Sequence, residues 1–313
     1  MRVFLTGAAG FIGSHTAEAL LKRGDEVLGV DDLNDYYDVA QKEANLQRLR
    51  AHAGFEFVRE DIRAETMEKL MVDFKPDVLL HLAARAGVRP SIKDPELYYD
   101  VNLRGTVNLL ESCRKAGVQQ VIFASSSSVY GAQEKVPFSE GDFTENPLSP
   151  YAATKRAGEN IIYSYSKMFG MKATCLRFFT VYGPAGRPDM APFLFTKKIN
   201  EGQTVPRFGD GGTARDYTYV ADIVSGIVAA VDKPFDFEIF NLGHNEPVQL
   251  NVLISTIEEL LGKKAVIEEL PEQPGDVPVT FADISKAQKM LGYQPNTSIK
   301  EGMQEFVNWY LKR

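Results

Sequence analysis

Residues 2–13 read RVFLTGAAGFIG, an apolar run that leads directly into a turn with glycines at positions 7, 10 and 13. The run predicts a buried strand over Arg2–Thr6, and the apolar spacing after it predicts a helix over Phe11–Arg23. Glycines let the backbone approach a pyrophosphate at the N-terminus of that helix, where free N–H groups favour negative charge. The spacing is Gly-x-x-Gly-x-x-Gly, not Gly-x-Gly-x-x-Gly, so a tight strand-to-helix turn without a ligand is the alternative.

The first half of the chain alternates short runs rich in Val, Ile and Leu with longer stretches of helical periodicity. A second helix is expected over Val101–Ala116, and further strands are expected at Glu26–Val30, Glu56–Val58, Val78–His81, Val121–Ser125 and Ala173–Phe178. Buried strands separated by helices indicate a parallel sheet covered on both faces. The predicted fold class is therefore α/β, a doubly wound parallel sheet whose ligands bind beyond the carboxyl ends of the strands.

The sequence changes after about Pro184 to shorter elements and loops with frequent Pro and Gly. We expect residues 184–313 to form mainly a smaller α/β lobe for the substrate, and residues 1–183 to form the dinucleotide-binding domain. Because Phe237–Leu242 has the apolar character of a buried strand, the chain is expected to return to the larger domain over about residues 215–245.

Composition excludes several classes of protein. The 313 residues carry a net charge of −7 and no dense block of Lys and Arg, which argues against binding to nucleic acid. No apolar run is long enough for a membrane span, and the first strand begins too close to Met1 for a cleaved leader, so we expect a cytosolic location. Cys113 and Cys175 are expected to be reduced core thiols, and four scattered histidines give no metal-ligand spacing, so no metal is expected.

The ends of the predicted strands offer contacts to a dinucleotide. Asp31 ends the second strand, where a carboxylate can hydrogen-bond the ribose hydroxyls and repel a 2′-phosphate, which favours NAD over NADP; Asp32 is the competing carboxylate. Asp61 with Ile62 can meet the adenine, although Asp61 could instead cap a helix. The small residues of Leu82-Ala83-Ala84 would admit the nicotinamide ribose and the pyrophosphate, or simply pack.

The chemically reactive residues are expected at the same edge of the sheet. Tyr151 and Lys155 lie one turn apart at the start of a predicted helix, so the phenol and the ammonium share a face. A positive charge and an oxidised nicotinamide nearby would lower the phenol pKa and make it a usable base. The serine run 125–128 ends the fifth strand, where hydroxyls can orient a substrate hydroxyl, although a flexible serine loop is the alternative.

The chain resembles the extended short-chain dehydrogenase/reductase family, a Rossmann family, along nearly its whole length, and within it the nucleotide-sugar epimerase branch. The segments that carry this resemblance are Thr6–Gly13, His81–Ala84, Ser125–Gly131, Tyr151–Lys155 and Arg215–Asp222. A narrower similarity to UDP-glucuronate 4-epimerases rests on Arg85–Arg89, Arg177–Pro184 with Gly186–Met190, and Gln273–Pro278.

This resemblance implies a cofactor, NAD, a UDP-sugar substrate and roles for individual residues. Tyr151 would be the base with Lys155 as its partner, and Ser126 would take the catalytic Ser/Thr position. It also implies a homodimer packed through the helices that begin at Val101 and Tyr151. The cofactor-binding residues expected are Gly7, Gly10, Phe11, Ile12, Gly13, Asp31, Asp32, Asp61, Ile62, Leu82, Ala83, Ala84, Asn102, Tyr151 and Lys155.

For the substrate, the resemblance implies that Arg215 and Asp276 hold the UDP diphosphate and ribose. If the sugar is glucuronate, hydrogen bonds to its carboxylate can hold the acid away from the orientation that loses CO₂. Arg89 is a candidate at the side of the same pocket. The residues expected at the substrate are Arg89, Ser127, Ser128, Thr180, Arg187, Arg215 and Asp276.

The expected reaction is oxidation at C4, rotation of the 4-keto sugar and reduction on its other face, and four alternatives stay open. A 4-epimerase of neutral UDP-hexoses would share the catalytic residues, although Thr180 and Gln273 depart from the Asn and Arg of many UDP-galactose epimerases. A UDP-glucuronate decarboxylase or a 4,6-dehydratase usually has an acidic residue beside the catalytic Ser/Thr, where this chain has Ser127 and Ser128. The non-enzymatic alternative is an NAD-sensing binding protein.

Overall fold

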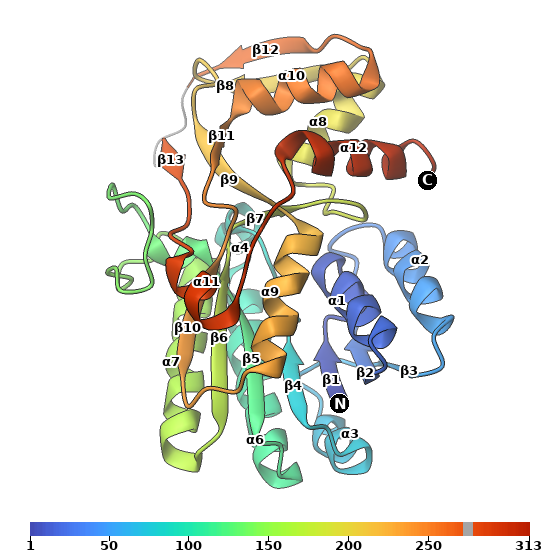
Figure 1. Cartoon of the computed structure of the whole chain (residues 1–313), viewed down its shortest axis with the longest axis vertical. Helices are drawn as coiled ribbons and strands as arrows, with labels where there is room; N and C mark the ends of the chain where they lie inside the picture. The colour runs from blue at the N-terminus through green and yellow to red at the C-terminus, as the bar shows by residue number, and fades with distance from the viewer. Residues whose placement is uncertain (272–277) are drawn as a thin grey trace.

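The computed structural model describes residues 1–271 and 278–313, and its centre is a seven-stranded parallel sheet in the order β10-β6-β5-β4-β1-β2-β3 (Figure 1). The strands are β1 (Arg2–Thr6), β2 (Glu26–Asp31), β3 (Phe55–Arg59), β4 (Val78–His81), β5 (Gln120–Ser126), β6 (Lys172–Phe178) and β10 (Glu238–Leu242). Each strand predicted for the first half of the chain is present, and the doubly wound fold class is confirmed.

Helices cover both faces of this sheet, and on each face a separate apolar core lies between the helices and the strands. On one face, α1 (Phe11–Lys22) packs against α9 (Val220–Asp232) and α2 (Val39–Arg50). On the other, α3 (Thr66–Phe74) packs against α6 (Gly105–Ala116), which contacts α7 (Pro150–Phe169). This arrangement explains why the central strands are apolar on both sides, without a period of two.

The strand order reverses beside β1. Thr6 at the end of β1 pairs with Val30 of β2 on one side and with His81 of β4 on the other. From β1 the chain adds β2 and β3 outward, and then crosses back to place β4 on the opposite side. A crevice at such a reversal, beyond the carboxyl ends of the strands, is where doubly wound folds bind their ligands.

A second, smaller lobe lies over this edge of the sheet, at the top of Figure 1. Its strands are β7 (Thr180–Tyr182), β9 (Ala214–Tyr219), β11 (Pro247–Gln249) and β13 (Val279–Thr280) in one sheet, and β8 (Thr204–Phe208) with β12 (Val266–Leu270) in another. Its helices are α8 (Ala191–Asn200), α10 (Leu250–Leu261) and α12 (Ile299–Tyr310). Between these elements the chain returns to the main sheet as β10, against which α11 (Ser285–Leu291) packs.

Between β4 and α6 the structure has short elements that the sequence analysis did not predict. They are α4 (Val88–Lys93) and α5 (Pro95–Tyr99), and a 3₁₀ turn (Ser127–Tyr130) follows β5. These segments are too short to show a hydrophobic period in the sequence. Asp94 ends α4 and also caps α5, where its side chain accepts the Leu97 N–H at 3.2 Å. The helix predicted over Val101–Ala116 is present, but its first residues belong to a π-helix (Asp100–Arg104), and α6 begins at Gly105. Among the described residues, no helix has the length and apolar character to cross a membrane.

Candidate active site

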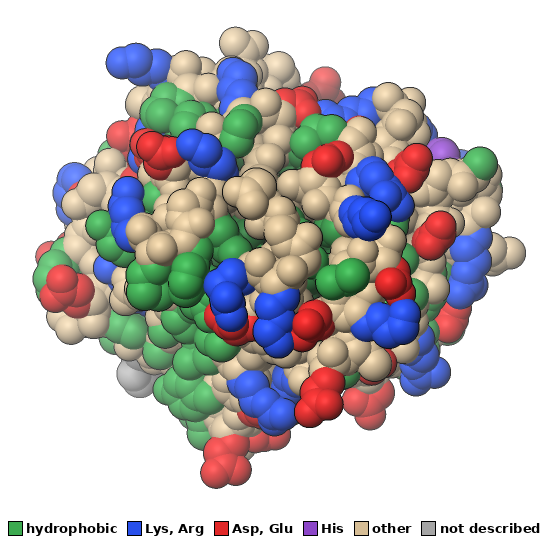
Figure 2. Space-filling model, turned by 90° about the horizontal axis from the view of Figure 1, so that it is seen from below, with side chains coloured by type: hydrophobic (Ala, Val, Ile, Leu, Met, Phe, Trp, Pro, Cys, Tyr) green, Lys and Arg blue, Asp and Glu red, His purple; other side chains and the backbone are tan. Residues whose placement is uncertain are grey.

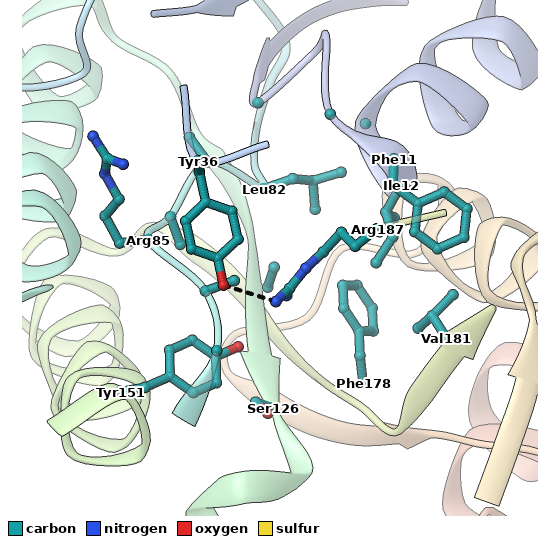
Figure 3. A pocket seen from close by; sticks show the side chains of 18 of the residues that line it. Phe11, Ile12, Tyr36, Leu82, Arg85, Ser126, Tyr151, Phe178, Val181 and Arg187 are labelled. Carbon is teal, nitrogen blue, oxygen red and sulfur yellow. Dashed lines mark hydrogen bonds between the residues drawn. The ribbon is translucent and has the colours of Figure 1, made fainter. Parts of the chain in front are cut away.

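A cavity of about 660 Å³ opens at the carboxyl ends of the main-sheet strands, and the second lobe contributes part of its wall (Figure 3). Almost every site residue predicted from the sequence lines it. These are Gly7, Gly10, Phe11, Ile12, Gly13, Asp31, Asp32, Asp61, Ile62, Leu82, Ala83, Ala84, Arg89, Ser126, Ser127, Ser128, Tyr151, Lys155, Thr180, Arg187 and Arg215. Asn102 lies outside this lining, and Asp276 and Gln273 lie outside the described residues.

The glycine turn packs so closely that side chains would collide. A Cβ on Gly13 would lie 2.0 Å from the carbonyl oxygen of Gly7, and one on Gly7, at φ +74°, would lie 2.8 Å from the Ala83 nitrogen. Gly10 is the N-cap residue of α1, and within the described part of the chain no side chain caps this helix end. Backbone N–H groups at this helix end are therefore left to meet an anion such as a pyrophosphate.

Asp31 lies at the floor of the cavity and organises the loop after β2. It accepts the Ala9 N–H at 3.2 Å and the Leu33 N–H at 2.9 Å, and Lys42 lies 3.7 Å away. Burial raises the pKa of Asp31, and the charge of Lys42 opposes this shift. Asp32, the competing carboxylate, accepts both the backbone and the side-chain N–H of Asn34, at 3.0 and 2.6 Å.

Lys42 also lines the cavity, but the sequence analysis did not find it. It is only 4% exposed, on a helix whose other buried residues include Gln41 and Asn45. The signal that could have found Lys42 is the polar character of α2, whose buried positions carry polar side chains.

Asp61 and Ile62 line the cavity, and their contact with the adenine stays a prediction. Asp61 accepts the backbone N–H of Arg63 at 2.8 Å and a side-chain N–H of the same arginine at 2.9 Å, and the Arg63 hydrogen bond holds the carboxyl pKa below its ordinary value. Helix α3 begins later, after Glu65, so the alternative that Asp61 caps a helix is wrong.

His81 ends β4 in a chain of buried hydrogen bonds. Its Nδ1 lies 2.8 Å from Thr6 Oγ1, and its Nε2 lies 3.0 Å from Thr106 Oγ1. Burial lowers the pKa of His81 to about 3, and the positive charge of Lys155 acts in the same direction, so the ring is neutral. Thr106 donates in turn to the Asn102 carbonyl at 2.6 Å.

Asn102 therefore supports the cavity wall from behind. Its side chain accepts the Arg85 N–H at 2.8 Å, donates to the Arg85 carbonyl at 3.0 Å, and reaches Thr154 at 3.0 Å. These bonds join the loop after β4 to helix α7. Direct contact of Asn102 with a cofactor stays a prediction.

Helix α7 presents Tyr151 and Lys155 to the cavity. Ser149 caps the helix by accepting the Ala152 N–H at 3.1 Å, and Pro150 occupies its first position. The Lys155 Nζ donates to the Ala124 carbonyl at 2.7 Å and lies 6.0 Å from the centre of the Tyr151 ring. Burial lowers the pKa of Lys155 to about 8, so the ammonium form still predominates at neutral pH.

Burial raises the pKa of the Tyr151 phenol, while a hydrogen bond with Ser126 and the positive charge of Arg187 act against this effect. Ser126 accepts the Ser128 N–H at 3.2 Å and contacts the Ser128 hydroxyl at 3.1 Å. Within the described chain, Ser126 and Arg187 thus join Lys155 as groups that can favour a phenolate.

A buried ion pair stands behind the serine run, and the sequence analysis missed it. Glu159 accepts two hydrogen bonds from Arg177, each of 2.8 Å, and one from Ser125 of 2.6 Å. The contacts with Glu159 raise the pKa of Arg177, although burial acts the other way. The spacing of Glu159 four residues after Lys155 gave a signal, since both then lie on one helix face.

The opposite wall carries arginines and Thr180. Arg187 hydrogen-bonds Asp189 through Nε at 3.0 Å and through Nη2 at 2.6 Å. Arg215 donates to the Ala214 carbonyl at 2.9 Å, and the Arg89 guanidinium lies 5.8 Å from the centre of the Phe208 ring in the second lobe. This wall therefore carries three arginines, of which Arg187 is paired with Asp189.

Residues 3–243 match the profile described as the NAD dependent epimerase/dehydratase family. The chain belongs to this family. It is 47% identical to a UDP-glucuronate 4-epimerase of Thermodesulfobacterium geofontis, over 97% of this chain and 94% of that protein. It is 46% identical to UDP-glucuronate 4-epimerase 2 of Arabidopsis thaliana, over 99% of this chain and 75% of the relative.

Solved structures of epimerases are similar to this epimerase/dehydratase chain over its full length. The UDP-glucuronic acid 4-epimerase of Bacillus cereus, in complex with UDP-glucuronic acid and NAD, has a TM-score of 0.94, 39% identity and coverage of 100% of this chain and 99% of its own. The UDP-glucose 4-epimerase of Thermotoga maritima, with UDP-glucose, has a TM-score of 0.91, 33% identity and the same coverage.

These findings confirm the predicted family and the predicted cofactor, NAD. The residues present fit this dinucleotide, because the glycine turn leaves no space for a Cβ and a carboxylate ends β2 beside it. Gly7, Gly10 and Gly13 would receive the pyrophosphate, and Asp31 or Asp32 the adenosine ribose.

Proposed function

We propose that the protein is an isomerase that epimerises a UDP-sugar at C4 with NAD, and that its substrate is UDP-glucuronate, converted to UDP-galacturonate. The observation that carries this proposal is one cavity that joins Tyr151, Lys155 and Ser126 to a wall containing Arg187. The Bacillus cereus epimerase, whose structure holds UDP-glucuronic acid and NAD, supports the choice of sugar.

Tyr151 acts as the base in this proposal. Its phenolate removes the proton of the C4 hydroxyl, directly or through Ser126, and later returns a proton to the C4 oxygen. NAD, when bound, accepts the hydride from C4 and returns it to the other face of the sugar. The 4-keto sugar must turn between these steps, so the site is expected to hold the UDP firmly and the sugar loosely.

Lys155 supports the phenolate by its charge. The hydrogen bond to the Ala124 carbonyl fixes its Nζ, and the pKa of about 8 leaves the ammonium protonated at neutral pH. A fixed positive charge near the phenol favours the phenolate over the phenol.

The carboxylate of a 4-keto glucuronate lies β to the ketone and loses CO₂ when the C–C bond aligns with the carbonyl π system. Arg187, Thr180 and the hydroxyls of Ser127 and Ser128 line the cavity near Tyr151 and can hold the carboxylate out of this alignment. No acidic residue stands beside Ser126 in the run Ser125–Ser128, in contrast to the usual decarboxylase and dehydratase pattern.

Arg215 and Arg89 are proposed to meet the UDP end of the substrate. Both line the cavity, and Arg215 belongs to β9 of the second lobe. Asp276, the proposed ribose contact, lies outside the described residues. We propose that residues 1–183 mainly hold NAD and that residues 184–313 mainly hold the UDP-sugar. The return to the larger domain, expected from about residue 215, begins after β9, because β9 pairs within the second lobe and β10 within the main sheet.

The proposed homodimer would pack through α6 and α7. Large apolar side chains are exposed on these helices, among them Val107, Tyr163 and Met168. Figure 2 shows hydrophobic side chains gathered toward one side of the face seen from below, among scattered charges. The cytosolic location stays a prediction from the sequence.

A neutral UDP-hexose is the second candidate substrate, because the Thermotoga maritima UDP-glucose 4-epimerase is also similar over the full length. The deciding experiment incubates the NAD-loaded protein with UDP-glucuronate, UDP-glucose and UDP-xylose and identifies the products by NMR. Formation of UDP-galacturonate with the highest kcat/KM supports the proposal. Faster turnover of UDP-glucose, or release of CO₂ with UDP-xylose as the product, would contradict it.

A further inference from the structure

Tyr36 joins the two walls of the cavity. It lies in the loop between β2 and α2, just after Asp31 and Asp32. Its hydroxyl accepts a hydrogen bond from Arg187 Nη2 at 3.0 Å and donates to Asp189 at 3.3 Å (Figure 3). The Arg187 guanidinium lies 5.3 Å from the centre of the Tyr36 ring.

These contacts hold the guanidinium of Arg187 in one orientation. Asp189 and Tyr36 engage its Nε and Nη2, whereas Nη1 makes no hydrogen bond to the described part of the protein. Arg187 and Tyr151 line the same cavity (Figure 3), and the positive charge of Arg187 acts to lower the pKa of the Tyr151 phenol. A fixed donor near that centre suits a carboxylate on the sugar.

The loop after β4 is shaped around the same contact. A Cβ on Gly87, at φ +99°, would lie 2.6 Å from the Tyr36 hydroxyl and 3.3 Å from Arg187 Nη2. Three segments far apart in the sequence, from the cofactor loop, the loop after β4 and the loop after β7, therefore meet at the Tyr36 hydroxyl.

We propose that Tyr36 is a positioning residue that joins the loop after β2 to Arg187 and holds the guanidinium ready for the carboxylate of the substrate. The inference rests on the proposed function, because it names the group through which a charged sugar is selected.

The first test is kinetic and uses Tyr36→Phe, which removes the hydroxyl and keeps the ring. Hydrogen bonds to charged groups support a rise in KM for UDP-glucuronate of about tenfold, with kcat changed by less than about twofold. Tyr99→Phe is the matched control, because Tyr99 is 43% exposed on α5 and does not line the cavity. In an Arg187→Gln background, Tyr36→Phe should add no further change in KM.

The second test repeats the kinetics with UDP-glucose, which has no carboxylate. In Tyr36→Phe protein the KM for this sugar should change by less than about twofold, because a displaced Arg187 loses no charge-assisted hydrogen bond to it.

The outcomes separate this inference from the proposed function. If the wild-type protein does not turn over UDP-glucuronate, the proposed function is wrong. If it does, and Tyr36→Phe leaves the KM for UDP-glucuronate unchanged, the positioning role of Tyr36 is overturned. An equal loss for UDP-glucose and UDP-glucuronate would also overturn it, because a merely structural role has no preference for the charged sugar.

Discussion

The two walls of the cavity are built by different means. The NAD wall consists largely of backbone: glycines that exclude any side chain, a helix end without a side-chain cap among the described residues, and strand ends. The sugar wall consists of long side chains, and Arg187 is held there by Asp189 and Tyr36. Substitutions in the first wall should therefore affect all substrates alike, whereas substitutions in the second should change which sugar is used.

The largest effect on cofactor binding is expected in the NAD wall, from Gly13→Ala. The new Cβ would lie 2.0 Å from the Gly7 carbonyl oxygen, so the turn must move away from the pyrophosphate position. We expect NAD affinity to fall by more than about 100-fold, the loss of about two good hydrogen bonds to an anion. Fluorescence titration with NAD measures this loss.

Gly141→Ala is the control for Gly13→Ala, because a Cβ on Gly141 meets nothing within 4 Å. If Gly13→Ala binds NAD as tightly as Gly141→Ala, the glycine turn does not hold the pyrophosphate.

Tyr151→Phe tests the point where the two walls meet. Loss of the general base should lower kcat by about 10³-fold to 10⁴-fold, at the upper end of what such groups contribute. NAD binding should persist, because the glycine turn is unchanged. Product formation followed by NMR gives kcat, and undiminished turnover would remove Tyr151 from its assigned role.

The support behind the walls is tested by Glu159→Gln. This change leaves the buried Arg177 without a charged partner, which in comparable pairs costs about 3–5 kcal/mol of unfolding free energy. Urea unfolding measures it, with Glu111→Gln on the exposed surface of α6 as the control. Equal stability of the two variants would show that the Arg177 pair does not stabilise this site.

The sugar wall is tested by Arg187→Gln. Loss of a charge-assisted hydrogen bond should raise KM for UDP-glucuronate by about 10-fold to 100-fold. KM for UDP-glucose should change little, because this sugar has no carboxylate. Steady-state kinetics with both substrates provide the ratio, and a parallel rise in both KM values would contradict a carboxylate role for Arg187.

The smallest effect concerns the pH dependence of stability. Because burial lowers the pKa of Lys155 from 10.5 to about 8, the unfolded chain binds more protons than the folded chain between these values. The unfolding free energy of the wild type relative to Lys155→Met should therefore rise with pH across this window, by at most about 1.4 kcal/mol per pH unit. A difference that stays flat from about pH 7 to about pH 10 would contradict the lowered pKa.

The contrast between the walls also explains what the sequence revealed. The strand ends and the glycine turn are local features, so most residues predicted for the NAD wall from β1 to β5 do line the cavity. The proximity of Tyr151 and Lys155 could be predicted equally well, because one helical turn brings the two side chains together. The domain limits and the roles of single residues at the cofactor remain predictions.

Contacts between side chains that are far apart in the sequence could not be predicted in this way. Tyr36 and Arg187 are separated by 151 positions, and no periodicity relates them. Glu159 and Arg177 pair across a helix and a strand, and Lys42 reaches Asp31 from a helix that has little apolar pattern. Such contacts depend on how the loops pack, which a single sequence does not state.

The central claim is that a phenolate on Tyr151 and the NAD held by the glycine turn act at the same position of the sugar, the phenolate on the C4 hydroxyl and NAD on the C4–H bond. Its most direct test supplies UDP-glucuronate deuterated at C4 in ordinary water and examines the product by NMR. The account predicts UDP-galacturonate that retains the deuterium at C4, because the hydride is stored and returned without exchange. Hydrogen from solvent at C4 of the product would contradict it.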